Sequence, residues 1–409
     1  MTIVTIIFMQ KIKNIYHLLR AVVANFRYGF PTRKLLTVAV TGTNGKTSTV
    51  NFIGQTLDLL GEKTAWITTI DFKVADKTWQ NKTKMTALDP MQFQKIAKDA
   101  VKAGCKYFIF EATSHAIDQK RIWGTHINVV VLTNVTRDHL DYHKTFKNYL
   151  KTKLKIFKRK TKAVINLDDE NSKKFIKKCR KIITYSIKNP KADLNLKNCE
   201  IKNDQLLGEF NQSNLLASLG VLISLGFDKK VIEKNISKLK NIRGRMELIE
   251  CGQNFKVLID YAHTPDAFKK LYRALLPLKK NKIIHVFGAT GARDKGKRPI
   301  LAKIASQFAD KIILTNEDPY HEKPAQIINE IAIGIPKIFT DFEIIIDRKR
   351  AIKKAVQVAK KDDIVLITGK GHEEIMAVSD GTKKGFMLVE FDEREIVRNT
   401  IQKILNTKS

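Results

Sequence analysis

The sequence predicts an α/β protein with two domains, each built on a mainly parallel sheet covered by helices. Short apolar segments of strand length alternate with helical segments in two successive series, which is typical of that architecture. The 409 residues, 43% of them hydrophobic, are enough for two or three packed domains. The alternation breaks near residues 236–245, so we expect an N-terminal amphipathic segment at 1–35, a first domain at 36–241 and a second at 242–409.

The N-terminal segment contains one predicted amphipathic helix, residues 10–27. Its apolar residues fall on one face at helical spacing, whereas its basic residues lie mostly elsewhere. That apolar face comprises Ile12, Ile15, Tyr16, Leu19, Val22, Val23 and Phe26. Two interpretations are open: the helix packs on the adjacent domain, or it lies on an anionic membrane.

The strands of both domains are predicted from short apolar runs. In the first domain these runs are Leu36–Thr41, Tyr107–Glu111, Val129–Asn134 and Ala163–Leu167, with a helix at Met91–Ala103. In the second domain they are Val257–Tyr261, Ile283–Gly288, Lys311–Thr315, Glu343–Ile346 and Ile364–Thr368, with a helix at Arg348–Lys360. Strands separated by helices in this way predict parallel pairing.

The chain is strongly basic, with 74 Lys and Arg against 41 Asp and Glu and a formal net charge of +33. The lysines are scattered, and no recognition helix, RNP aromatics or zinc module is evident, so we expect no specific nucleic-acid partner. Four cysteines without a CxxC pair suit a reducing cytoplasm. No apolar run reaches the roughly 20 residues of a spanning helix, and Met1–Met9 lacks signal-peptide features. We therefore expect a cytoplasmic protein, with any membrane contact peripheral and at the inner surface.

The strongest chemical signal is the segment Thr41-Gly-Thr-Asn-Gly-Lys-Thr-Ser48, which joins an apolar strand to a helix. Backbone N–H groups in such a glycine-rich turn cradle phosphates together with the helix N-terminus. The candidates for ATP contact are Gly42, Thr43, Asn44, Gly45, Lys46, Thr47 and Ser48. Lys46 is expected to reach the β/γ-phosphates and Thr47 to hold Mg²⁺. Only two residues separate the glycines, whereas the usual loop has four.

The shortened loop resembles that of the Mur ligases and folylpolyglutamate synthases, and later motifs resemble the muramyl-tripeptide synthetases among the Mur ligases. The matching segments are Glu111-Ala-Thr-Ser-His115 with Asp118-Gln-Lys-Arg121, Thr133-Asn-Val-Thr-Arg-Asp-His-Leu-Asp-Tyr-His143, Tyr149-Leu-Lys-Thr-Lys-Leu-Lys-Ile-Phe157, Phe210-Asn211 with Asn214, Gly244-Arg-Met-Glu247, Asp260-Tyr-Ala-His-Thr-Pro-Asp266, Arg293-Asp-Lys-Gly-Lys-Arg298 and Gly369-Lys-Gly-His-Glu373. They occur in the same order and extend over nearly the whole chain.

The resemblance implies a central P-loop-type ATPase domain with a parallel sheet and a C-terminal Rossmann-like α/β domain. It also implies an ATP-dependent amide-bond ligase. In its reaction an acceptor carboxylate takes the γ-phosphoryl group of ATP, and an incoming amine then displaces phosphate from the acyl phosphate. The expected partners are a muramyl-peptide-type acceptor and a free amino acid, a diamino acid in this branch, in peptidoglycan precursor synthesis.

The family motifs assign the ATP and metal sites to particular residues. Beyond the loop, the resemblance places ATP against Asn211, Asn214, Arg245, Asp260 and His263. It assigns two Mg²⁺ ions, the first to Thr47 and Glu111, the second to His139 and to Lys153 carbamylated by CO₂ as N6-carboxylysine. The predicted catalytic residues are therefore Lys46, His139, Lys153 and Arg245, because every species near the transferred phosphoryl group is anionic.

The same motifs assign the other two substrates. The acceptor is expected at Thr86, Thr113, Ser114, His115 and Arg121, and the amino acid at Arg293, Asp318, Tyr320, Gly369 and Glu373. The remaining histidines, His17, His126, His285 and His321, are expected to be ordinary packed or exposed residues.

Three departures from the family pattern bear on substrate choice. The phosphate-loop strand begins at Leu36, too early for the further N-terminal domain that grips uridine nucleotide in full-length ligases, which leaves uridine recognition open. The loop Met85–Pro90 differs from the family's M-T-T-P. Tyr320 stands where the family's D-N-P-R has the arginine that clamps the distal carboxylate of diaminopimelate. With the nearby acidic residues Glu317, Asp318 and Glu322, this favours lysine or ornithine.

Other functions compete with this interpretation. One is a folylpolyglutamate-synthase-like or other Mur-family amide ligase that acts on a different carrier. Another is a regulatory ATP-binding protein without catalysis, and a third, suggested only by the charge, is a nucleic-acid-binding ATPase. The intact set Lys46, Glu111, His139, Lys153 and Arg245 argues against a decayed, non-catalytic site.

Overall fold

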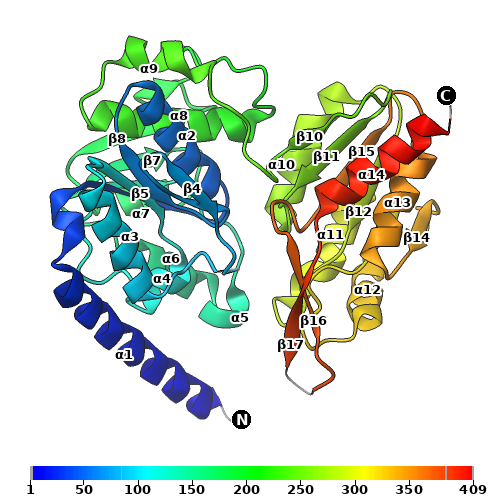
Figure 1. The fold of residues 1–409 in the computed structure, drawn as a ribbon, viewed down its shortest axis with the longest axis horizontal. Helices are drawn as coiled ribbons and strands as arrows, with labels where there is room; N and C mark the ends of the chain where they lie inside the picture. Colours follow the sequence, from blue (N-terminus) through cyan, green and yellow to red (C-terminus); the bar gives the residue numbers. More distant parts are fainter. Residues whose placement is uncertain (1–2, 84, 383–384, 408–409) are drawn as a thin grey trace. The chain divides into compact units, whose positions relative to one another are not determined.

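The chain forms two compact units in the computed structural model, which describes residues 3–83, 85–382 and 385–407 (Figure 1). Unit 1 comprises Met1–Gln205 and Glu209–Lys240, and unit 2 comprises Leu206–Gly208 and Asn241–Ser409. Each unit contains its own sheet, helices and hydrophobic core.

Unit 1 is built on a nine-stranded sheet in the order β4-β3-β2-β5-β1-β6-β7-β8-β9. Its strands are β1 Leu36–Thr41, β2 Thr64–Ile67, β3 Asp71–Val74, β4 Lys77–Gln80, β5 Tyr107–Glu111, β6 Val129–Leu132, β7 Lys162–Asn166, β8 Ile182–Ser186 and β9 Leu194–Asn195. The pairs from β2 to β9 are parallel, and β3 and β4 add an antiparallel extension. The parallel sheet predicted for this domain is confirmed.

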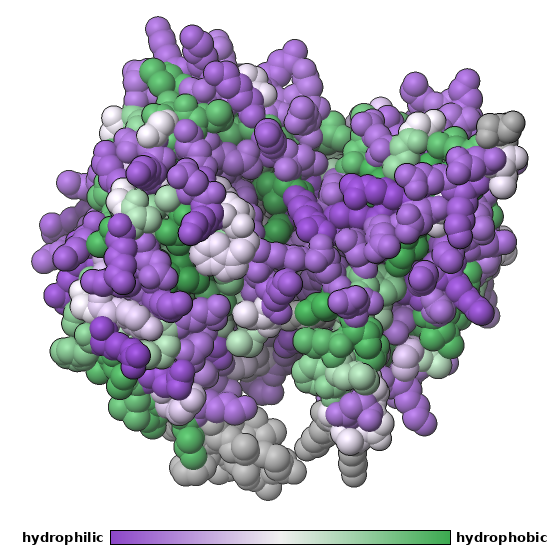
Figure 2. Space-filling model, viewed as in Figure 1, coloured by the Kyte–Doolittle hydropathy of each residue, from purple (hydrophilic) through white to green (hydrophobic). Residues whose placement is uncertain are grey.

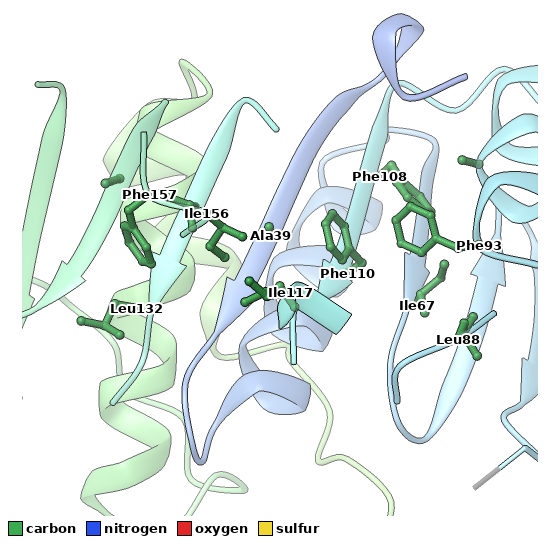
Figure 3. Close-up of a cluster of buried hydrophobic side chains, with 14 of the residues drawn as sticks. Ala39, Ile67, Leu88, Phe93, Phe108, Phe110, Ile117, Leu132, Ile156 and Phe157 are labelled. Carbon is green, nitrogen blue, oxygen red and sulfur yellow. The ribbon is translucent and has the colours of Figure 1, made fainter. Parts of the chain in front are cut away.

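The helices of unit 1 lie on both faces of the sheet. They are α1 Ile3–Tyr28, α2 Lys46–Leu59, α3 Pro90–Lys102, α4 Ser114–Asp118, α5 Leu140–His143, α6 Phe146–Leu154, α7 Ser172–Ile176, α8 Glu209–Ser224 and α9 Lys229–Ile236. Helix α2 packs with α8 and α9, whereas α3 packs with α1 and contacts β2 and β3. Between α3 and the sheet, the Phe93 ring meets Phe108 and Phe110 edge-on, with ring centroids 5.4 and 5.1 Å apart (Figure 3).

Unit 2 is built on a six-stranded sheet in the order β10-β11-β15-β12-β13-β14 and a separate hairpin, β16-β17. Its strands are β10 Glu247–Ile249, β11 Lys256–Asp260, β12 Ile283–Phe287, β13 Lys311–Leu314, β14 Phe342–Ile344, β15 Ile364–Thr368, β16 Ile375–Ser379 and β17 Phe386–Glu390. Its helices are α10 Pro265–Leu275, α11 Arg298–Ala305, α12 Pro324–Ala332, α13 Arg348–Val358 and α14 Glu393–Asn406. The sheet is parallel except for β10, so the predicted architecture is confirmed here too.

Helix α1 packs on unit 1 through a face that we did not expect. Ala21, Ala24 and Asn25 are fully buried, and the small alanines let the backbone of α1 approach closely. The predicted apolar face is exposed instead, with Leu19 60% and Phe26 71% accessible. Of the two interpretations left open, packing on the adjacent domain is thus observed, although through this other face. None of the helices in the described part of the chain is long and apolar enough to cross a membrane.

Candidate active site

The phosphate loop leaves β1 at the middle of the nine-stranded sheet, with β5 and β6 on either side. This is the position where parallel sheets bind ligands, because the crossovers diverge there. The loop ends at Gly45, whose φ of 85° is left-handed, and a Cβ there would lie 2.4 Å from Asn214 Oδ1. Helix α2 then begins at Lys46, so its positive end faces the loop. The structure thus brings Gly45 and the predicted Asn214 together.

Two residues after β6 hold the phosphate loop in shape. The backbone amide of Thr43 donates to Asn134 O at 2.7 Å, and that of Asn44 donates to Asn134 Oδ1 at 3.0 Å. The Thr133 hydroxyl donates to Asn44 O at 2.7 Å. These bonds fix the backbone of the shortened loop. Sequence reasoning did not assign this role to Thr133 and Asn134, although both lie in a quoted motif.

The first predicted metal pair is assembled beside the loop. The Thr47 hydroxyl donates to Glu111 Oε1 at 2.8 Å, from the first turn of α2 to the end of β5. The backbone amide of Thr69 donates to the same oxygen at 2.7 Å, and the Thr69 and Thr86 hydroxyls lie 2.7 Å apart. A carboxylate and a hydroxyl are oxygen ligands of the kind that Mg²⁺ prefers. Thr69 also links the predicted acceptor residue Thr86 to this pair.

Lys153 is almost fully buried, with 1% of its surface accessible. Its Nζ donates to Gly42 O at 2.7 Å, and Lys46 Nζ donates to the same carbonyl at 3.0 Å. Burial, followed by the nearby charge of Lys46, holds the pKa of Lys153 well below its ordinary value. A lowered pKa favours the neutral amine, which is the form of lysine that reacts with CO₂. Its burial also shows that Lys153 is not an ordinary surface lysine.

His139 belongs to a cluster of rings in unit 1. Its ring centroid is 4.9 Å from that of His115 and 6.3 Å from that of Tyr149. Burial lowers its pKa to about 3, and His115, Lys46 and Lys153 add to the effect, although Asp138 at 3.3 Å opposes it. A neutral imidazole is the form that ligates metal ions. The ring of Tyr149 also lies 4.7 Å from Lys153 Nζ, so it contacts both predicted ligands of the second metal.

The predicted acceptor residues lie around this cluster. Arg121 donates through Nη1 to Ala87 O at 2.7 Å, in the loop that also carries Thr86. Thr113 caps α4 by accepting from the Ala116 amide at 3.1 Å. Within the described residues, the buried Ser114 Oγ has no hydrogen-bond partner, so this polar atom remains available to a ligand. Arg121 also donates through Nη2 to His17 Nε2 at 3.1 Å, so His17 packs against a predicted acceptor residue.

In unit 2, three of the quoted motifs converge beside Tyr261. The Arg245 guanidinium lies 4.7 Å from the Tyr261 ring, and the His263 and His372 rings contact the same tyrosine. The Asp260 carboxylate accepts from the backbone amides of Met246 at 2.8 Å and Ala262 at 2.6 Å. Asp260 therefore fixes the backbone around Arg245, a role additional to the ATP contact that the resemblance implied.

A second group in unit 2 surrounds Lys370, which is fully buried. Its Nζ donates to Asp318 at 3.0 Å and to Glu373 at 2.5 Å. Burial would lower the pKa of Lys370, but the two carboxylates outweigh it and raise the pKa above the ordinary value. The predicted amino-acid residue Tyr320 packs edge-on against Phe386 with ring centroids 4.8 Å apart. Burial raises the pKa of Tyr320, and the charge of Arg293 opposes that rise.

Comparison with known proteins agrees with these motifs. Residues 40–222 match the model of the Mur ligase middle domain, and residues 244–371 match the Mur ligase, glutamate ligase domain. A UDP-N-acetylmuramoyl-L-alanyl-D-glutamate–2,6-diaminopimelate ligase of Clostridium tetani is 36% identical over 96% of this chain and 83% of its own. A UDP-N-acetylmuramyl-tripeptide synthetase of Roseiflexus sp. is also 36% identical, over 85% and 75%. A solved structure of a ligase with the first of these names is 33% identical, with a TM-score of 0.61 over 91% of this chain and 79% of its own.

The chain belongs to the Mur ligase family. It is therefore an ATP-dependent ligase that joins an acid to an amino acid. The predicted family and reaction class are confirmed.

The metal set expected of a Mur ligase can be tested against these side chains. Thr47 and Glu111 fit Mg²⁺ directly, and neutral His139 is a competent ligand. Lys153 as an amine is not a typical Mg²⁺ ligand, whereas a carbamate at Nζ would offer oxygen. Within the described residues, no group of three or more His, Cys, Asp or Glu side chains is placed to hold a metal ion. The expected set does not need one, because it includes a hydroxyl and a modified lysine.

The contacts of three acidic residues do not support one inference about the amino-acid site of this Mur ligase. We expected Glu317, Asp318 and Glu322 to attract a cationic amino acid. Asp318 instead pairs with Lys370, and Glu322 accepts from Arg298 at 3.0 and 3.2 Å, while Glu317 accepts from the Thr290 hydroxyl at 2.6 Å. Two of the three charges are thus neutralised within unit 2. Lys370 itself was quoted only as part of a motif, and no sequence signal distinguished it from the chain's many exposed lysines.

Proposed function

We propose that this Mur ligase adds a diamino acid to a muramyl dipeptide in peptidoglycan precursor synthesis, with the cytoplasm as its location because ATP is available there. The observation that carries the proposal is the grouping around the phosphate loop. Lys46 and Lys153 share the Gly42 carbonyl, Glu111 holds Thr47, and Thr86 and His115 lie next to these groups. Phosphoryl-transfer groups and expected acceptor groups thus lie together in one unit.

The proposed reaction follows from these side chains. The acceptor carboxylate attacks the γ-phosphorus of ATP, the bond to the β-γ bridging oxygen breaks, and ADP leaves. The amino group then attacks the acyl carbon, loses a proton, and expels phosphate. Lys46 would stabilise the charge that develops on the γ-phosphoryl oxygens. Arg121, held between the Ala87 carbonyl and His17, would contact the acceptor.

We also propose that Thr47 and Glu111 hold one Mg²⁺ and that His139 and carbamylated Lys153 hold a second. When bound, such ions would neutralise charge on the phosphates and on the acceptor carboxylate. The buried, neutral-prone Lys153 supports this proposal, because a carbamate forms only on an unprotonated amine. In unit 2, Arg245, Asp260 and His263 stay proposed ATP contacts, and Gly369 and Glu373 stay proposed amino-acid contacts.

We propose diaminopimelate as the first candidate for the amino acid, because that amino acid appears in the names of two of the relatives described above. Arg293 is exposed and its charge acts on Tyr320, so it is a cation that could bind the distal carboxylate of diaminopimelate. One observation favours a second candidate, lysine or ornithine: Tyr320 cannot form the bidentate pair that an arginine would form there.

A substrate panel tests the proposal. The purified protein is given ATP, Mg²⁺ and UDP-linked or free muramyl dipeptide, crossed with diaminopimelate, lysine and ornithine, and phosphate release is measured. We expect release that requires both substrates and that Lys46→Ala lowers by about 10²–10⁴. Amino-acid-independent release would contradict the ligase proposal.

The same panel separates the two amino-acid candidates. If diaminopimelate is the substrate, Arg293→Ala should raise its KM at least about fivefold, the loss expected for one charged hydrogen bond. If lysine or ornithine is preferred, Tyr320→Arg should shift the preference toward diaminopimelate. If the wild type prefers diaminopimelate and Arg293→Ala keeps that preference, Arg293 does not bind the distal carboxylate.

A further inference from the structure

Helix α1 presents an exposed apolar stripe that the ligase reaction does not use. The stripe consists of Ile12, Ile15, Tyr16, Leu19, Val23 and Phe26, each between 50% and 71% accessible. Their spacing of three or four residues aligns them along one side of the helix. Figure 2 shows hydrophobic side chains gathered at the lower left, where Figure 1 places α1.

The opposite side of α1 is already occupied by the rest of unit 1. Gln10 Nε2 donates to the Tyr142 hydroxyl at 2.7 Å, and Asn14 Nδ2 donates to Asp118 Oδ2 at 3.3 Å. Asn25 Nδ2 donates to Trp123 O at 2.7 Å. Because these polar contacts and the buried alanines fix the rotation of α1, the helix cannot turn its apolar stripe into unit 1 without breaking them.

The charges around the stripe indicate what covers it. The chain has no acidic residue before Asp58, and α1 carries Lys13, Arg20 and Arg27 at intervals of seven residues along one flank of the stripe. Lys13 and Arg27 are exposed, whereas Arg20 is paired with Asp89 at 2.9 Å. Exposed Arg33 and Lys34 follow directly after the helix. An apolar stripe flanked by cations suits a surface that has an outer layer of anionic groups over an apolar interior.

We propose that α1 is an interfacial anchor that binds this ligase to the surface of an anionic lipid bilayer. The stripe enters the boundary between headgroups and acyl chains, and Lys13 and Arg27 contact lipid phosphates beside it. A second copy of the chain is a poorer occupant, because two such helices would bring like charges together without an acidic partner. The proposal goes beyond the ligase reaction and does not depend on it.

Vesicle co-sedimentation of the full chain tests the anchor. The probes are vesicles of phosphatidylglycerol with phosphatidylcholine, and vesicles of phosphatidylcholine alone, at low and high salt. We expect binding to the anionic vesicles that weakens with salt. The triple variant Ile15→Ser/Leu19→Ser/Val23→Ser should bind at least about tenfold more weakly, and Lys13→Gln/Arg27→Gln should lose affinity only for anionic vesicles.

A matched control removes exposed apolar side chains elsewhere. Ile333→Ser/Ile338→Ser, at positions 79% and 91% accessible in unit 2, should bind vesicles like the wild type. Unchanged ligase turnover without vesicles shows that each variant is folded. Absence of wild-type binding, or undiminished binding by the triple variant, would overturn the proposal. So would a concentration-dependent dimer that the triple variant dissociates, because a second copy would then cover the stripe.

Discussion

The buried Lys153 gives the first prediction at the scale of a single residue. Replacing it with alanine should lower turnover by about 10²–10⁴, because the proposed second metal loses an oxygen ligand. A small carboxylate such as formate or acetate should restore part of the rate by occupying the vacated space. The measurement is steady-state phosphate release with and without the added carboxylate.

The control for Lys153 is the exposed Lys151, two residues earlier on α6, whose replacement by alanine should leave turnover near the wild-type value. Removing dissolved CO₂ should slow the wild type reversibly, with recovery on adding bicarbonate. The carbamate proposal would be contradicted if Lys151→Ala lowered turnover as much as Lys153→Ala does. It would also be contradicted if Lys153→Ala kept most of the wild-type turnover.

His285 gives unit 2 a pH-dependent stability. The ring is fully buried between the Tyr272 hydroxyl at 2.6 Å and Thr368 Oγ1 at 2.9 Å, and burial lowers its pKa to about 3. Between the ordinary pKa of about 6.5 and that value, the unfolded state binds the proton and the folded state does not, so stability falls as pH falls. From pH 7 to pH 5 the loss from this group should be about 2 kcal/mol.

Calorimetric unfolding of the full chain and of His285→Gln at both pH values measures that loss. The variant is expected to be less stable at pH 7 but to lose less stability on acidification. Equal losses in the two proteins would show that His285 does not titrate with unfolding. The expectation that His285 is an ordinary packed or exposed residue came from the lack of any motif around it, and its burial and two hydrogen bonds show that it is packed.

Single residues were predictable where a motif fixed their register. Glu111, His139 and Lys153 were assigned by the resemblance of their segments to Mur ligase motifs, and the structure places Glu111 and Lys153 against the phosphate loop. Thr69 and His17 were not assigned, because Glu111 and Arg121, which they contact, are far away in the sequence. The same holds for the pairing of Lys370 with Asp318.

At the scale of an element, α1 contacts the proposed acceptor site as well as carrying the stripe. His17 accepts from Arg121, and burial, followed by the charge of Arg121, lowers its pKa and so favours the neutral ring that can accept this bond. His17→Ala should raise the KM for the acceptor about five- to tenfold, the effect of one lost hydrogen bond, with little change in kcat. His17→Gln, which keeps an acceptor atom, should restore part of the affinity.

The comparison variant for His17 is Lys13→Gln, one helical turn away and exposed, which should leave both kinetic constants unchanged. A fall in kcat without a change in KM would show that His17 stabilises the fold rather than positions Arg121. The contact between His17 and Arg121 was not predicted, because the helix was interpreted through its apolar face and its polar face makes the contacts.

Strands were predictable where they are buried on both faces. β1, β5 and β15 have the predicted bounds, because a continuous apolar run has clear ends. The antiparallel strands β3 and β4 and the hairpin β16-β17 were not predicted. The short strands β3 and β4 mix polar and apolar residues, so they contain no continuous apolar run that would predict a strand. Phe386, Met387 and Leu388 on β17 are apolar, but they are about half exposed.

At the scale of the whole molecule, both units have parallel sheets of the kind that the alternation of apolar runs predicted. The central claim is that this Mur ligase activates its acceptor as an acyl phosphate and transfers it to an amino acid. The most direct test uses muramyl dipeptide labelled with ¹⁸O in the reacting carboxylate, and follows product and released phosphate by mass spectrometry. The account predicts one ¹⁸O atom in phosphate for each amide formed, because the carboxylate oxygen stays with phosphorus when the amine displaces it. Unlabelled phosphate, or phosphate released without amide, would contradict it.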